Sequence, residues 1–188
     1  LDVRNAALPF IQELHRVTRE TISLYVLEGA ERVCVERLES PQNVRIIARL
    51  GRRVPLYAGS AGKVFLAFVS TEKRLEILNA TPPQAITDST IVDIEALNDE
   101  LKRIRKKGYA VSFGEWVAEA AGVAAPVFDH RGEIIAAVTI SGPEQRFKED
   151  VVQRYITDIT RVAALISREM GFAGKGDGTS LNGLIDEG

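Results

Sequence analysis

The sequence contains few of the residues that build metal centres and covalent active sites. Its 188 residues include one cysteine, Cys34, and two histidines, His15 and His130. One cysteine cannot form an intrachain disulfide, and these three residues cannot supply a structural zinc site. Neither histidine has a serine or cysteine partner nearby in the sequence. Cys34 lies in a β-rich run, where an inert buried thiol is more common than a reactive one. We therefore expect no metal, no cofactor and no catalytic residue.

Long apolar runs and an excess of positive charge are also missing. No apolar run reaches the roughly 20 residues that a membrane-spanning helix requires, and no signal-peptide pattern opens the chain. We therefore expect no membrane partner and a cytoplasmic location. The 24 Lys and Arg residues are outnumbered by 26 Asp and Glu residues, which gives a net charge of -2. A DNA-binding segment normally presents a basic face, so nucleic acid is not expected to bind this chain directly.

The composition is that of one ordinary globular domain. Hydrophobic residues make up 45% of the sequence and charged residues 27%, which is enough to bury a sizeable core. The glycine-rich residues 172–188 have the composition of a flexible tail.

The first half of the chain predicts one helix and a set of strands. Apolar residues recur at helical spacing before residue 18, and Pro9 is tolerated there only near the helix start or at a kink. This predicted apolar stripe consists of Ala7, Phe10, Ile11, Leu14 and Val17. Residues 21–27 and 32–38 are β-rich runs joined by a hairpin at 28–31, and residues 44–48 predict a third strand.

Three further helices are predicted after this sheet. A short helix over 71–79 ends before Pro82, and a longer helix begins at its cap Asp93 and stops at Gly108. The longer helix has its apolar face at Ile94, Leu97, Leu101 and Ile104. Its basic last turn suits the helix dipole and a solvated face better than a nucleic-acid patch. The final helix, 148–170, has a broad apolar face that can pack on a sheet.

The most informative segment is 54–67, where an extended run leads into a helix that begins with small residues. Pro55 favours an extended Val54, and Ser60 can cap the helix. The free amides of residues 60–62 would then face an anion such as a small carboxylate. A phosphate-binding P-loop is not favoured, because Tyr57 and Val64 occupy its glycine and Ser/Thr positions. The alternative is that the small residues only allow close packing on a sheet.

A second motif region, 108–143, contains strand-like pieces at 109–113, 122–128 and 133–141 and a hairpin turn at 129–132. The ordered fragments are GRRVPLYAGSAGK at 51–63, GYA at 108–110, AAPVFD at 124–129 and TISGP at 139–143. With their spacing, they make the chain resemble the effector-binding domain of the IclR family of bacterial transcriptional regulators. The resemblance extends from the helix before Thr21 to the last helix near Met170.

The resemblance implies a fold, a domain arrangement and partners. The fold would be a GAF-like (profilin-like) α/β (α+β) fold, with a curved, mainly antiparallel sheet of about six strands flanked by helices. Residues 1–18 would be the end of a linker helix, 19–171 the effector-binding domain and 172–188 the tail. The domain would sense a small molecule and control an N-terminal winged helix-turn-helix domain as a homodimer or homotetramer. Because the chain begins at Leu1 rather than Met and lacks that domain, we expect it to be part of a longer regulator.

The resemblance also implies a ligand site. Ser60 and Ala61 would offer amides to a carboxylate, while Thr139 and Ser141, two apart on one strand, would offer hydroxyls. Ser112 and Gly122 stand where some family members have an acidic residue and a thiol, so the effector's identity stays open. The full expected set is Ser60, Ala61, Gly62, Ser112, Gly122, Thr139, Ser141, Val54, Ile46, Ala120 and Trp116.

Two alternatives to effector sensing remain open. The first is a dimerisation module whose pocket is filled, for example by Trp116 or Phe113. The second is a small GAF-fold enzyme such as a sulfoxide reductase, which would need reactive cysteines beyond Cys34. Glu115 and Glu119 could suggest paired catalytic carboxylates, but no nucleophile or metal partner accompanies them, and structural or solvated roles are favoured.

Overall fold

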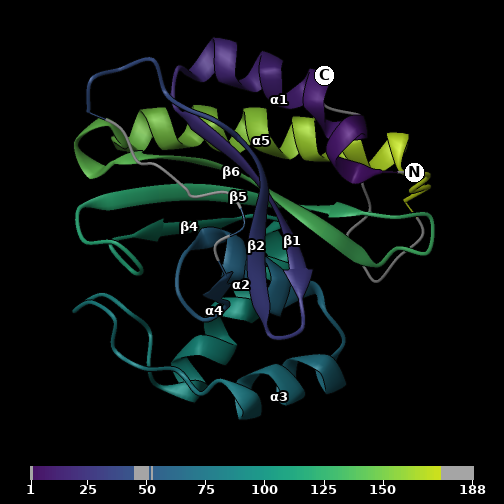
Figure 1. Cartoon of the computed structure of the whole chain (residues 1–188). Coiled ribbons are helices and arrows are strands. Elements are labelled where there is room, and N and C mark those ends of the chain that lie inside the picture. The colour runs from purple at the N-terminus through teal and green to yellow at the C-terminus, as the bar shows by residue number, and fades with distance from the viewer. Residues whose placement is uncertain (1, 45–50, 52, 175–188) are drawn as a thin grey trace.

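The computed structural model describes residues 2–44, 51 and 53–174, which form a six-stranded sheet between two helical layers. Helices α1 and α5 cover one face of the sheet, and α2, α3 and α4 lie on the other side (Figure 1). The strands are β1 (Thr21–Glu28), β2 (Glu31–Leu38), β3 (Arg53–Pro55), β4 (Ala110–Phe113), β5 (Ala120–Phe128) and β6 (Ile134–Pro143). The helices are α1 (Val3–Thr18), α2 (Ser60–Phe68), α3 (Thr71–Ala80), α4 (Ile94–Lys107), the 3-10 helix η1 (Glu144–Arg146) and α5 (Glu149–Glu169).

The strand order is β3-β2-β1-β6-β5-β4, and every neighbouring pair is antiparallel. The predicted hairpins at 28–31 and 129–132 both form, with Gly29 and Gly132 at positive φ. A register shift between Leu24 and Tyr25 sets Cys34 opposite Tyr25. The strand predicted at 44–48 falls mostly outside the described residues, and Val44 itself lies in a bend.

Helix α1 packs through a narrower stripe than the sequence predicts. Ala7, Ile11 and Leu14 are buried, but Val17 is 47% exposed and Thr18 takes its place against the core. The spacing 7, 11, 14, 18 follows the helical repeat, so the stripe passes Val17 by. Pro9 lies on the exposed side of the second turn, where the carbonyl that loses its helical donor faces solvent.

The helices below the sheet are fixed at their ends by polar groups. Helix α2 begins after Gly59, whose φ of 92° makes it the capping residue in place of the predicted Ser60. At its other end, Arg74 donates to the carbonyls of Leu66 and Val69 at 2.6 and 3.1 Å. Arg105 of α4 donates to the Ala67 carbonyl, so part of the basic last turn of α4 has a structural role.

Helix α4 has the capping residues that the sequence predicts. The Asp93 carboxylate accepts a hydrogen bond from the Ala96 amide at 2.9 Å, and Gly108 ends the helix in the left-handed region. Leu97, Leu101 and Ile104 are buried. Ile94 was predicted on the same face, but it is the first residue of the helix and is 44% exposed.

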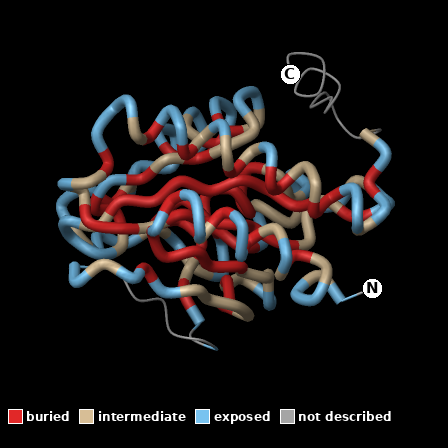
Figure 2. The backbone as a smooth tube through the Cα atoms, turned by 90° about the horizontal axis from the view of Figure 1, so that it is seen from above, coloured by how far each residue is buried: buried red, intermediate tan, exposed pale blue. Residues whose placement is uncertain are grey.

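Most residues of the central strands are buried (Figure 2). The two faces of the sheet differ in side-chain size. Large residues such as Ile22, Leu24 and Ile140 pack against α1 and α5. Small residues, Ala110, Ala124 and Ala137, face α2 and α4. Alanine on this face lets α2 approach the strands closely, and it brings the start of α2 over the part of the sheet that carries hydroxyl groups.

Candidate functional site

Hydroxyl groups from several strands gather on the α2 side of the sheet. Thr21, Ser141, Gly122 and Ser112 oppose one another in one row across β1, β6, β5 and β4. Opposed residues of an antiparallel sheet share a face. The next row on the same face contains Ser23, Thr139, Ala124 and Ala110. Ser112 and Thr139 are buried and Ser141 is half-buried, so a polar strip runs across an otherwise apolar face.

The start of α2 lies directly over this strip. A methyl group at Gly122 would lie 2.8 Å from the Ser60 hydroxyl and 3.5 Å from the Ser112 hydroxyl, so these three predicted residues come together. Gly62 is more tightly constrained, because a methyl group there would collide with the Leu56 carbonyl oxygen and with Arg32 Nη1. Glycine at these two positions lets the first turn of α2 sit on the strands. The backbone amides of this first turn have no acceptor within the helix, and they lie close to the hydroxyl groups of the strands.

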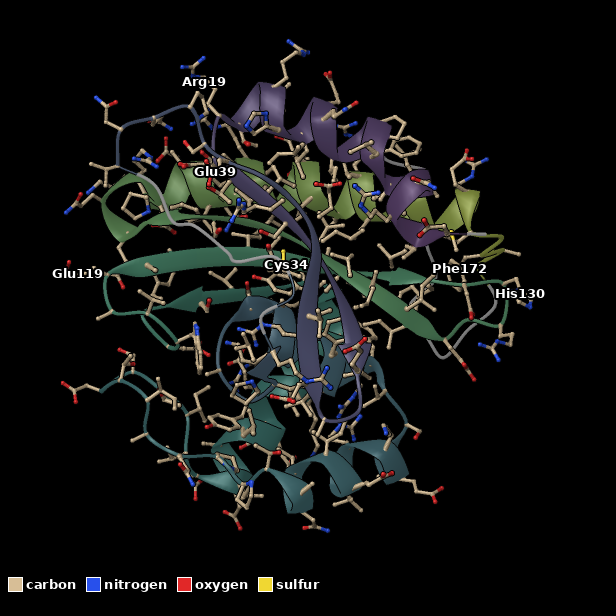
Figure 3. All side chains as sticks on the ribbon, viewed as in Figure 1. Arg19, Cys34, Glu39, Glu119, His130 and Phe172 are labelled. Atoms are coloured by element: carbon tan, nitrogen blue, oxygen red, sulfur yellow. The ribbon has the colours of Figure 1, made fainter. Side chains whose placement is uncertain are left out.

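Lys63, the last residue of the glycine-containing motif, is buried with a side-chain exposure of only 2%. Its Nζ lies 2.7 Å from Glu115 Oε2, donates to the Val111 carbonyl at 3.0 Å and lies 3.8 Å from Glu100 Oε1. The other Glu115 oxygen accepts the Gly59 amide at 3.2 Å. Glu115 therefore has the structural role that the sequence favours. Glu119 is exposed at the far end of the sheet (Figure 3), so the two carboxylates do not form a catalytic pair.

Arg32 is a second buried cation, which sequence analysis did not identify. Its Nη1 donates to the carbonyls of Pro55 and Ala58 at 2.7 and 2.8 Å, and its guanidinium carbon lies 5.5 Å from the centre of the Tyr25 ring. Burial lowers the pKa of the Arg32 guanidinium, whereas Tyr25 and Glu115 raise it. The alternation of side chains along β2 could have identified Arg32. Arg32 and Cys34 are two residues apart on one strand, so both side chains lie on the same face of the sheet.

The formal charges around the start of α2 balance. Arg32 and Lys63 are buried cations, Glu115 is a buried carboxylate, and Glu100 lies 3.8 Å from Lys63 Nζ. The N-terminus of α2 adds a partial positive charge that stabilises anions, and the Gly59 amide already donates to the Glu115 carboxylate. The remaining amides and hydroxyls suit a second, small carboxylate.

Three of the four apolar residues expected around the site lie within the described residues. Val54 is buried and pairs with Arg32, and Ala120 is half-buried on the same side of β5 as Gly122. Trp116 is half-buried against the α2–α4 core. Ile46 lies outside the described residues.

The two histidines lie away from this site. His15 Nε2 is 2.7 Å from the Glu39 carbonyl oxygen, and His130 is exposed in the β5–β6 turn, on the same side of the molecule as Phe172 (Figure 3). No group of three or more metal-ligating side chains occurs within residues 2–44 and 53–174.

Cys34 lies near the middle of the molecule, on the strip side of β2 (Figure 3). The side chain is buried, and its Sγ donates to the Glu36 carbonyl at 3.3 Å. Burial raises the pKa of the thiol to about 11, while the hydrogen bond to the Glu36 backbone, Ser23 and Arg37 lower it and the charge of Glu36 raises it. The thiol is therefore protonated at neutral pH, which does not favour an enzyme that uses Cys34 as its nucleophile.

We expect Cys34 to react slowly with iodoacetamide in the folded protein. A pKa about two units above the ordinary value reduces the thiolate fraction about 100-fold, before steric protection is counted. Alkylation at pH 8 followed by mass spectrometry, in buffer and in 6 M urea as the unfolded reference, measures the ratio. Equal rates in the two solutions would contradict a buried, protonated thiol.

Comparison with known proteins decides the family. A family model described as "Bacterial transcriptional regulator IclR C-terminal" matches residues 1–168. The chain belongs to the IclR family. It is 37% identical over 173 residues to the HTH-type transcriptional regulator KipR of Bacillus subtilis, which covers 92% of this chain and 69% of KipR. It is 36% identical to the HTH-type transcriptional repressor AllR of Escherichia coli over 149 residues, 79% of this chain and 55% of AllR. The chain thus spans between about half and about two thirds of these IclR-family regulators.

Solved structures agree with this assignment. Thermotoga maritima IclR superposes with a TM-score of 0.88 at 34% identity, covering 92% of this chain and 70% of that one. The C-terminal domain of E. coli KdgR has a TM-score of 0.83 at 34% identity and is covered completely. The GAF-like α/β fold and the family predicted from the sequence are therefore confirmed. The relatives are named regulators and repressors, which also confirms a regulatory rather than an enzymatic IclR protein. No helix within the described residues could cross a membrane.

Proposed function

We propose that this IclR C-terminal domain senses a small carboxylic acid on the α2 side of its sheet. The observation that carries the proposal is the buried hydroxyl strip beneath the first turn of α2. The carboxylate of the acid would accept hydrogen bonds from the amides of residues 60–62 and from the Ser60 hydroxyl. The rest of the acid would contact Ser141 and Thr139. Val54, Ala120 and Trp116 would form the apolar surroundings.

Sensing would control a winged helix-turn-helix DNA-binding domain in the same cytoplasmic regulator, acting as a dimer or tetramer. An acid changes the affinity for DNA only if it binds one arrangement of the oligomer more tightly than the other. A tenfold change in DNA affinity requires about 1.4 kcal/mol of such preference. Residues 1–18 would link the two domains, residues 19–171 would bind the effector and residues 172–188 would form the tail.

A thermal-shift screen of short-chain, keto, sugar and aromatic acids tests the proposal, because a ligand that binds only the native state raises the melting temperature. A saturable shift with one class of acid supports sensing and defines that class. The absence of a shift in a folded sample free of co-purified ligand would instead support a dimerisation module.

Ser141→Ala is expected to weaken binding of the acid found in this screen by about fivefold, as for one lost hydrogen bond of about 1 kcal/mol. The half-buried hydroxyl contributes little to packing, so the melting temperature of the free protein should hardly change. Isothermal titration calorimetry measures the affinity. Thr157→Ala serves as the control, because the Thr157 hydroxyl donates only to its own helix on the other face of the sheet. Unchanged affinity in Ser141→Ala would remove Ser141 from the site.

A further inference from the structure

Ser23, on β1 at one end of the hydroxyl strip, has a fully buried side chain whose oxygen has no hydrogen bond to any described residue. It lies on β1 directly opposite Thr139 of β6. The hydroxyl lowers the pKa of both the Cys34 thiol and the Tyr25 phenol, but it is not in hydrogen-bond geometry with either group. The predicted site did not include β1.

The two threonine hydroxyls next to Ser23 on this face have partners within the protein. The Thr21 oxygen accepts the Ser40 amide at 3.1 Å, and the Thr139 hydroxyl donates to the backbone carbonyl of Ser23 at 3.5 Å. Buried hydroxyl groups are nearly always hydrogen-bonded, because leaving one unpaired is costly. Ser23 therefore needs a partner that the described residues do not provide, and a bound molecule on the strip would supply it.

We propose that Ser23 is a specificity-determining residue that contacts a hydroxyl group of the effector, at the end remote from its carboxylate. This inference rests on the proposed carboxylate site at the start of α2. A serine hydroxyl both donates and accepts, so it can pair with an alcohol that the apolar surroundings would otherwise reject.

The sheet geometry sets the length of this effector. Ser60 lies over Gly122 on β5, and Ser23 lies on β1, two strands away and two residues along the strand direction. Adjacent strands are about 4.8 Å apart and each residue rises about 3.4 Å, so the two serines are separated by about 12 Å. A hydrogen bond of about 2.8 Å at each end leaves about 6 Å between the polar atoms of the ligand, which corresponds to an acid of about five to six carbons. A two-carbon acid would not reach Ser23.

Matched five-carbon acids test this inference. Pentanoate, 4-hydroxypentanoate and 5-hydroxypentanoate are titrated calorimetrically into the wild-type chain, with acetate as the short reference. We expect at least one hydroxy acid to bind about two- to tenfold more tightly than pentanoate, as for one added hydrogen bond. Ser23→Ala should erase this difference, leave pentanoate binding unchanged, and leave the melting temperature of the free protein unchanged or raised.

Ser167→Ala provides the matched control. Ser167 is an equally buried serine on α5 that donates to the Ala163 carbonyl at 2.8 Å and accepts the Phe128 amide at 3.0 Å. This variant should lower the melting temperature but keep the preference for the hydroxy acid.

Two results would overturn the role of Ser23 without affecting the carboxylate site. One is equal binding of pentanoate and both hydroxy acids. The other is a preference that persists in Ser23→Ala while the free variant loses stability, because an internal water would then be the partner of Ser23. Failure of every acid to bind the wild-type chain would overturn the carboxylate site itself.

Discussion

Replacing Lys63 by methionine is expected to lower the free energy of unfolding by about 3–5 kcal/mol, because it leaves a buried carboxylate without its cation. Methionine keeps most of the side-chain volume, so the loss reports charge rather than a cavity. Glu115 would retain the Gly59 amide, but its 2.7 Å contact with Lys63 would be gone. Urea denaturation followed by circular dichroism measures the loss.

Two further variants separate the buried pair from general effects of removing a lysine. Lys63→Met combined with Glu115→Gln removes both charges, and it should recover a substantial part of the lost stability. Lys102→Met, on the exposed side of α4, should change stability by no more than about 0.5 kcal/mol. If Lys63→Met were as mild as Lys102→Met, the Lys63–Glu115 contact would not be a buried ion pair in solution.

Arg146→Met is expected to lower the free energy of unfolding by about 3 kcal/mol, the lower end of the range for a broken buried pair, since Arg146 is partly exposed. Its partner Glu20 is only 1% exposed and accepts from Arg146 Nη2 at 2.7 Å and from Nε at 3.0 Å. Tyr155 adds a longer contact of 3.3 Å from its hydroxyl to Glu20. Without Arg146, that phenol is the main remaining partner of the carboxylate.

Thermal and urea unfolding of Arg146→Met should be compared with two other variants. Arg146→Lys keeps the positive charge but loses the bidentate hydrogen bonding to Glu20. Its free energy of unfolding should therefore lie between those of the wild type and Arg146→Met. Arg161→Met removes an exposed arginine of α5 that lies 3.6 Å from Asp158, and it should cost less than about 1 kcal/mol. Equal losses in Arg146→Met and Arg161→Met would contradict a buried role for Glu20.

Local sequence signals were enough to predict much of the fold. The two hairpins follow from Gly29 and Gly132 between alternating apolar runs, and α4 follows from Asp93 and Gly108 at its ends. These signals act within a few residues, so they can be identified without the tertiary structure. Val17 was predicted to belong to the buried stripe of α1, but it is exposed. The width of that stripe depends on which parts of the tertiary structure pack against α1, and local signals do not contain this information.

The polar interactions of the site were less accessible from the sequence. Lys63 and Glu115 are 52 positions apart, and no local pattern connects them. The unpaired oxygen of Ser23 is a property of the assembled sheet, since any serine in a β-rich run has the same local appearance. Ser60, Ser112 and Gly122 were named together only through the family motifs, and the structure brings them into one cluster.

The short connection between α1 and β1 has a mechanical consequence. Only Arg19, which has a left-handed backbone, and the buried Glu20 separate the helix from the strand that carries Thr21 and Ser23. A 16-residue helix is about 24 Å long. If α1 tilted as a rigid body by about 10° at Arg19, its far end would move by about 4 Å. A small movement of β1 on the proposed binding face would in this way produce a larger movement at the opposite end of α1.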